Sequence, residues 1–95
     1  MTAVENAARL RRAIEETARM CAQVDEASTA IRPHPGKWCA REVLGHLIDS
    51  ACNNHRRFAL GLAGDVSRWD GYEQDAWVRG QRYADARWPH LVALW

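Results

Sequence analysis

The fold of this chain is decided by residues 40–62, which read AREVLGHLIDSACNNHRRFALGL. Plotted at 100° per residue, one broad face of this stretch collects Val43, Leu44, Leu47, Ile48, Ala51, Cys52, His55, Phe58, Ala59 and Leu62. This periodicity predicts an amphipathic helix over residues 40–62. Cys39 is the expected N-cap, and Glu42 stands three residues later, at the spacing of a capping box. A thiol replaces the usual hydroxyl, so we expect a weaker cap.

A second long helix is predicted before this one, over residues 2–27. Thr2 and Glu5 form a T-x-x-E capping box at its start. A mostly apolar seam then recurs at alternating spacings of four and three residues, through Ala3, Ala7, Leu10, Ile14, Thr17, Cys21 and Val24. The seam is rich in alanine, so another helix can approach it closely.

After the central helix, residues 63–84 combine turn-forming residues with Trp69, Tyr72, Trp77 and Tyr83. A solvated linker would not carry so many aromatics, so we expect an ordered crossing loop with a short helix near residues 73–78. A third helix is predicted over residues 85–95, with Asp85 as N-cap and Pro89 in the first turn. Its apolar positions are Trp88, Leu91, Val92 and Trp95.

These elements predict one all-α domain over residues 1–95, an incomplete up-down bundle made of two long helices, a crossing loop and the start of a third helix. Such a chain cannot cover every apolar helix face by itself, and each uncovered large side chain forfeits roughly 1.5–3 kcal/mol. We therefore expect a homodimer that forms through the uncovered faces.

Composition narrows the classes of function. The chain has 95 residues, with 13 Lys and Arg against 12 Asp and Glu, giving a net charge of +1. This balance disfavours a nucleic-acid partner, and no window is apolar enough for a membrane span. The three cysteines have no CxxC spacing and the N-terminus has no apolar signal region. We therefore expect reduced thiols in a cytoplasmic protein.

Four residues of the central helix align as a polar stripe: His46, Asp49, Asn53 and Arg57, at i, i+3, i+7 and i+11. One interpretation is a metal ligand, His46, with polar neighbours facing a pocket; the other is the solvated back of an amphipathic helix. His55 lies on the apolar face instead, as a core or interface histidine. No cysteine has an evident activating base, so nothing indicates nucleophilic catalysis.

The motif P-x-P-G-K-W-x-x-x-E-x-x-G-H-L-x-D over residues 33–49, continued by N-N-H-R-R-F over residues 53–58, resembles the DinB-like superfamily, which includes the YfiT-type proteins. G-Y-x-Q-D-x-W over residues 71–77 is similar to that family's loop after the second helix. The resemblance implies a four-helix bundle and a divalent metal, nickel or zinc, bound by three histidines. His46 corresponds to the first ligand, while the family's H-x-x-x-H pair on the last helix is absent.

The resemblance implies a metal-dependent hydrolase or thiol transferase scaffold with an incomplete metal site, acting on a small-molecule substrate. In this role His46 is a metal ligand, and Asp49, Asn53 and Arg57 orient it or line the pocket. The alternatives are a non-catalytic helical module that dimerises, or a truncated remnant without independent activity.

Overall fold

The computed structural model describes residues 1–64 and 70–95, which form four α-helices and no β-strand. The elements are α1 (Ala3–Ala22), the 3-10 helix η1 (Glu26–Ala30), α2 (Ala40–Leu62), α3 (Gln74–Gly80), the 3-10 helix η2 (Tyr83–Asp85) and α4 (Trp88–Leu94). The predicted all-α class and the bounds of the central helix are confirmed for this part of the chain. A search of the described helices finds none with the length and apolar character of a membrane span.

The first helix is shorter than predicted: it ends at Ala22 rather than at residue 27, and η1 follows. Its N-terminal capping box is present, with the Glu5 N–H donating to Thr2 Oγ1 at 3.1 Å and the Thr2 N–H donating to Glu5 Oε2 at 2.8 Å. Beyond Ala22, Ser28 Oγ donates to the Asp25 carbonyl at 2.7 Å. The helix cannot continue to residue 27 because Asp25 has an extended backbone, with φ −66° and ψ 126°; the Ser28 bond belongs to η1, which follows this break.

The last helix also begins later than predicted. Arg87, not Asp85, is its N-cap, and Pro89 lies in the first turn as expected. Asp85 ends η2, where its carboxylate pairs with Arg82 at 2.9 Å. Ala86 has an extended backbone, with φ −75° and ψ 146°, so no α-helix can begin directly after Asp85. The short helix predicted near residues 73–78 is confirmed as α3, while residues 65–69 of the crossing loop lie outside the described part.

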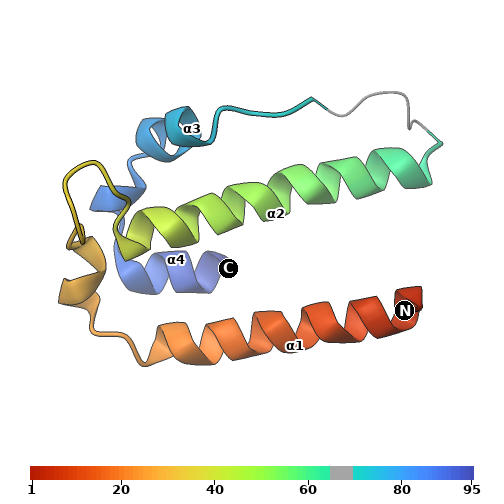
Figure 1. Ribbon diagram of the computed structural model, residues 1–95, viewed down its shortest axis with the longest axis horizontal. Helices are drawn as coiled ribbons and strands as arrows, with labels where there is room; N and C mark the ends of the chain where they lie inside the picture. The colour runs from red at the N-terminus through yellow and green to blue at the C-terminus, as the bar shows by residue number, and fades with distance from the viewer. Residues whose placement is uncertain (65–69) are drawn as a thin grey trace.

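The two long helices run antiparallel, and α4 lies between them at one end of the molecule (Figure 1). At this end α2 contacts η1, α3, η2 and α4, and α4 also contacts α1. The Trp88 indole N–H donates to the Cys21 carbonyl at 2.9 Å, which ties α4 to the last turn of α1. Arg41 Nε donates to Thr29 Oγ1 at 2.8 Å, which fixes η1 beside the start of α2.

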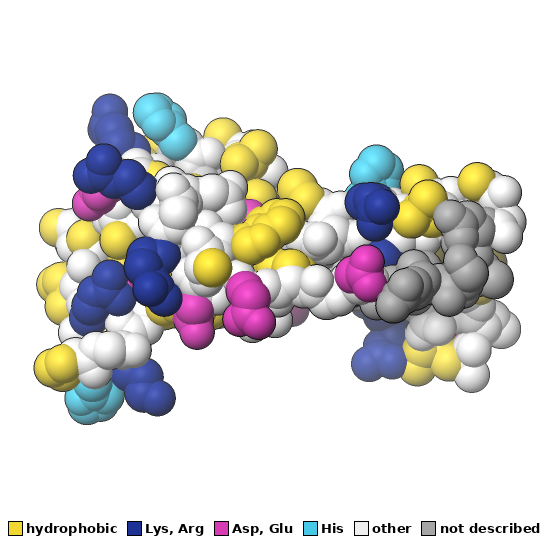
Figure 2. Space-filling view, turned by 90° about the horizontal axis from the view of Figure 1, so that it is seen from above, with side chains coloured by type: hydrophobic (Ala, Val, Ile, Leu, Met, Phe, Trp, Pro, Cys, Tyr) yellow, Lys and Arg dark blue, Asp and Glu magenta, His cyan; other side chains and the backbone are white. Residues whose placement is uncertain are grey.

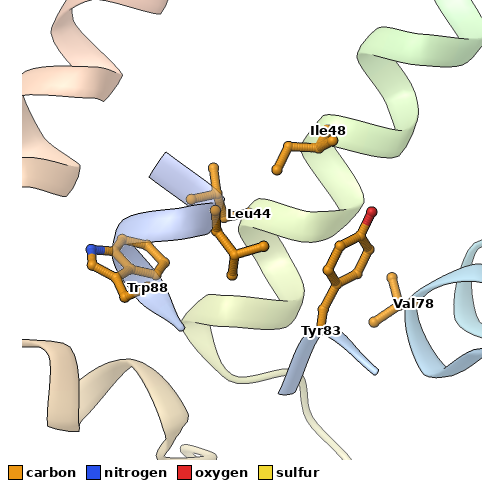
Figure 3. Packing of buried hydrophobic residues seen from close by; sticks show 6 residues of the cluster. Leu44, Ile48, Val78, Tyr83 and Trp88 are labelled. Carbon is orange, nitrogen blue, oxygen red and sulfur yellow. The ribbon is translucent and has the colours of Figure 1, made fainter. Parts of the chain in front are cut away.

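The end of the molecule where α4 lies between the two long helices is called the closed end below. It contains the hydrophobic core, whose packing is drawn in Figure 3. The core contains Leu44, Ile48, Val78, Tyr83, Trp88 and Leu91. The predicted apolar positions of the last helix all contribute, because Val92 and Trp95 pack against the cluster from its edge. Gly45 has a particular role in this core: a Cβ at this position would overlap the ring of Tyr83. The absence of a side chain there lets the ring lie against the α2 backbone.

At the other end, the apolar stripes of both long helices are exposed. None of the residues of α1 is buried, and Leu10 is 59% exposed. On α2, the face that carries Leu44 in the core continues into Phe58 and Leu62, which are 62% and 91% exposed. Seen from above, apolar side chains reach the surface at several places between separated groups of charged side chains (Figure 2).

We call the exposed stripes the open face, and it consists of Ala7, Leu10 and Ile14 on α1 with His55, Phe58 and Leu62 on α2. The α1 residues of the open face lie on the same face of α1 as Cys21, and the α2 residues lie on the same face of α2 as Leu44. Cys21 and Leu44 both pack in or against the cluster that contains residues of α4. The two sets of residues therefore border the same space beyond the end of α4. His55, predicted as a core or interface residue, is exposed here.

Gly45→Ala should destabilise the protein by about 1–3 kcal/mol, because the added methyl group forces the Tyr83 ring away from α2. Gly61→Ala, in the last turn of the same helix, is the matched control, since its methyl group would meet no atom within 4 Å. There, the better helix propensity of alanine should leave stability unchanged or raise it by up to about 1 kcal/mol. Urea unfolding of both variants measures the difference; equal effects would contradict the packing role of Gly45.

Candidate functional site

Asp49 is the most deeply buried member of the predicted polar stripe. Its side chain lies in the closed end, 3% exposed. The Tyr83 hydroxyl donates to Oδ1 at 2.7 Å, and Gln81 Nε2 lies 2.9 and 3.0 Å from the two carboxylate oxygens. Burial and this carboxylate raise the pKa of Tyr83, so the phenol remains a protonated donor. Asp49 therefore joins α2 to the segment after α3 rather than facing solvent.

His46 lies one turn earlier and has a different environment. Its imidazole packs against Trp38, with ring centroids 5.1 Å apart and planes tilted by 42°. Nδ1 of His46 is buried and finds no hydrogen-bond partner in residues 1–64 and 70–95. A buried ring nitrogen without a partner costs about 1–3 kcal/mol, so this atom is a place where a further donor or cation would be stabilising.

Asn53 and Arg57 form the distal half of the stripe. Asn53 Nδ2 donates back to the Asp49 carbonyl at 2.9 Å, one turn along α2. Arg57 donates to Asn54 Oδ1 at 3.2 Å and to the Asp70 carbonyl at 3.0 Å, which holds the segment before α3 against α2. A polar pocket of about 250 Å³ lies here, lined by Ser50, Asn54, Arg57, Gly71, Tyr72 and Gln74.

The four residues of the predicted polar stripe therefore do not form one site in the structure. His46 and Arg57 are eleven residues apart on one helix, about 16 Å at 1.5 Å per residue, and Arg57 alone of the four lines the polar pocket. The interpretation as a solvated helix back is wrong for Asp49, which is buried. Tyr83 and Gln81, the partners of Asp49, were missed by sequence reasoning because a separation of more than 30 residues leaves no periodic signal.

The residues of the family-like motif have structural roles at the closed end. The Cys39 N–H donates to Glu42 Oε1 at 3.1 Å, as the predicted capping box requires. Arg32 forms an ion pair with the same carboxylate. Gly45 admits the Tyr83 ring, and Asp49 accepts the Tyr83 hydroxyl. These residues of the motif therefore cap the start of α2 and form the surface of its first three turns on which Tyr83 packs.

A nickel or zinc site of the kind that the resemblance implies does not fit these residues. In the described part of the chain, no three His, Cys, Asp or Glu side chains lie close enough to hold a metal ion. His46 is a single imidazole, whereas zinc sites use three or four protein ligands. Asp49, the nearest carboxylate on the stripe, is already occupied by Tyr83 and Gln81. No catalytic step through a metal follows from this geometry.

The three cysteines are free thiols, and within residues 1–64 and 70–95 none of them belongs to a group of three metal-ligating side chains. Cys39 is buried at the start of α2, Cys52 is exposed, and burial raises the pKa of the Cys21 thiol. A raised thiol pKa lowers the fraction of nucleophilic thiolate. For Cys21 this environment disfavours nucleophilic attack, and the expectation that no cysteine acts as a nucleophile stays a prediction from the sequence.

Comparisons with known proteins do not assign this chain to a family. No protein-family model, no curated protein and no solved structure matches this chain. The DinB-like resemblance therefore rests on the motifs in the sequence.

Glu42 gives the closed end a specific dependence on pH. Its burial acts to raise the carboxyl pKa, but the Cys39 N–H and Arg32 outweigh it, and the net pKa lies below the usual value of 4.5. A carboxyl whose pKa is lower in the folded state than in the unfolded state stabilises the fold at pH values above the unfolded-state pKa. This contribution is lost as the pH falls through the folded-state pKa. We expect the free energy of unfolding to decrease below about pH 4.5, and Glu42→Gln to flatten part of that decrease.

Urea unfolding from pH 7 to pH 3 measures this effect. Glu16→Gln, on the exposed polar side of α1, is the control, and its curve should follow that of the unmodified protein. The assignment is contradicted if Glu42→Gln and Glu16→Gln give the same pH dependence.

Proposed function

We propose that this chain is a docking module with a DinB-like bundle architecture, which binds an apolar helical surface rather than catalysing a reaction with its own residues. The observation that carries this proposal is the open face. A 20-residue amphipathic helix with no buried residue is packed at one end only. Most helical stability in proteins comes from covering such a face, so the arrangement is suited to receiving another helix.

The DinB-like assignment is part of this proposal and is supported by the motif over residues 33–49. An antiparallel pair of long helices with a shorter helix between them at one end is compatible with a four-helix bundle that has an open position. The polar groups of the motif are engaged in holding α2, α3 and η2 together, which supports a structural use of the family pattern. The cytoplasmic location stays a prediction from the sequence.

A second candidate is the metal-dependent hydrolase or thiol transferase scaffold. The buried, unpartnered Nδ1 of His46 is the specific observation in its favour. In that case the missing ligands would come from outside the described residues, and Asp49, Asn53 and Arg57 would act as neighbours of the site.

Metal binding separates the two candidates. Titration of the purified chain with Zn²⁺ or Ni²⁺ should give only weak binding to single imidazoles, because no three ligand side chains lie together in the described residues. His46→Ala removes one of the four histidines and should leave most of that weak binding. Stoichiometric tight binding that His46→Ala abolishes would favour the scaffold and contradict the proposed docking role as the main function.

The docking surface itself can be probed at protein concentrations low enough to avoid self-association. An apolar fluorescent dye should bind the unmodified chain, and Leu10→Glu or Phe58→Glu should reduce its fluorescence several-fold, since both remove apolar surface from the open face. Arg12→Glu, on the opposite side of α1, is the control that should not change it. Equal fluorescence in all four proteins would contradict the proposed surface.

A further inference from the structure

We propose that a cavity beside Trp38 binds a small zwitterion, of which an α-amino acid with an apolar side chain is the simplest example. The cavity has a volume of about 310 Å³ and is lined by Arg32, Gly36, Trp38, Glu42, Asp75 and Arg79. It lies at the closed end, between the loop before α2 and one side of α3. None of its lining residues belongs to the open face, so the inference goes beyond the docking role and is tested independently of it.

The wall formed by the loop before α2 is held in place by its own contacts. Arg32 Nη1 donates to the Lys37 carbonyl at 2.9 Å, which closes the loop. Arg32 also forms an ion pair with Glu42, which joins the loop to the first turn of α2. Trp38 packs against the hydrophobic core and against the ring of His46. A wall that is already ordered loses little conformational freedom when a ligand binds.

The other wall is α3, which supplies two charges that are not used within the protein. Asp75 and Arg79 are four residues apart in α3, so they lie on one side of this helix, about 6 Å apart along its axis. Val78, which is 1% exposed, anchors α3 in the core. Within residues 1–64 and 70–95, the side chains of Asp75 and Arg79 pair neither with each other nor with another charged side chain. The cavity therefore presents one carboxylate and one guanidinium that are available to a ligand.

The charges of the lining indicate the class of ligand. Arg32 and Glu42 neutralise each other through their ion pair, which leaves Asp75 and Arg79. A simple anion would be attracted by Arg79 but repelled by Asp75, and a simple cation would meet the opposite combination. A molecule that carries both an ammonium and a carboxylate group matches both residues. Its ammonium group would donate to Asp75 and its carboxylate would accept from Arg79, each in a charge-assisted hydrogen bond.

A wider hollow of about 620 Å³ adjoins the cavity and shares Gly36, Trp38 and Asp75 with it. Pro33 and Val43 add apolar surface there beside the Trp38 indole. Both volumes fall in the range of small-molecule sites, about 300–1,000 Å³. We expect the apolar side chain of the ligand to lie in this hollow. Because the charged groups stay in contact with water, we expect weak binding, with a dissociation constant on the order of 1 mM.

Titration of the isotope-labelled full chain with L-phenylalanine, followed by NMR, tests the proposal. We expect saturable shifts of the Gly36 amide, the Trp38 indole N–H and the α3 amides. Two related compounds separate the charges: phenethylamine lacks the carboxylate, and hydrocinnamate lacks the ammonium group. Each should bind at least about fivefold more weakly than L-phenylalanine, because each leaves one charge of the cavity unpaired and is repelled by it.

Two substitutions in α3 test the assigned contacts. Asp75→Asn and Arg79→Gln should each weaken the binding of L-phenylalanine about three- to fivefold, since each removes one charge pair. Asp75→Asn should also narrow the difference between L-phenylalanine and hydrocinnamate, which a merely structural role would not do. Both side chains are exposed, so the fold should be retained, and circular dichroism checks this. Glu73→Gln is the matched control: Glu73 is an exposed carboxylate just before α3 that does not line the cavity, and its loss should leave the affinity unchanged.

Binding of L-phenylalanine that exceeds that of both related compounds, and that both substitutions weaken, would support the zwitterion site. The proposal is overturned if no saturable shift occurs at tens of millimolar L-phenylalanine. It is also overturned if hydrocinnamate or phenethylamine binds equally well, or if Asp75→Asn and Arg79→Gln leave the affinity unchanged. None of these results bears on the docking role, whose test uses residues of the open face.

Discussion

The contact between Tyr83 and α2 is the interaction on which the rest of this fold depends. The ring lies where Gly45 has no side chain, and the hydroxyl reaches one turn further to the buried Asp49 carboxylate. This contact joins the first half of α2 to a segment nearly 40 residues later. It also positions α3 on one side and α4 on the other, because both adjoin η2 in the chain.

The packing on this contact is confined to one end of the molecule. The buried cluster contains no residue of α1, and the last turns of α2 are exposed. The long helices therefore project from a closed end that is tied by Tyr83, Trp88 and Arg41. The proposed docking role follows from this division, since the closed end uses the polar groups of the motif and leaves the open face as the surface available for a partner.

Periodicity predicted the helices better than it predicted their burial. The apolar face of residues 40–62 was assigned correctly to a helix, yet Leu44 is in the core and Phe58, on the same face, is exposed. Leu44 is covered by Val78, Tyr83 and Leu91, which lie far along the chain, and local spacing does not encode these contacts. Asp49 shows the same limit, because its burial is caused by Tyr83 and Gln81, far away in sequence. The end of the first helix and the start of the last helix were misplaced because the backbone is extended at Asp25 and at Ala86.

Amide hydrogen exchange, followed residue by residue over a range of protein concentrations, tests the central claim most directly. The account predicts that amides around Leu44 and Ile48 are strongly protected at every concentration, because the closed end folds within one chain. Amides around Leu10 and Ile14 should exchange rapidly in dilute protein, because no residue of α1 is buried and α1 is packed at one end only. Protection around Leu10 and Ile14 as strong as that around Leu44 and Ile48 in dilute protein would contradict it.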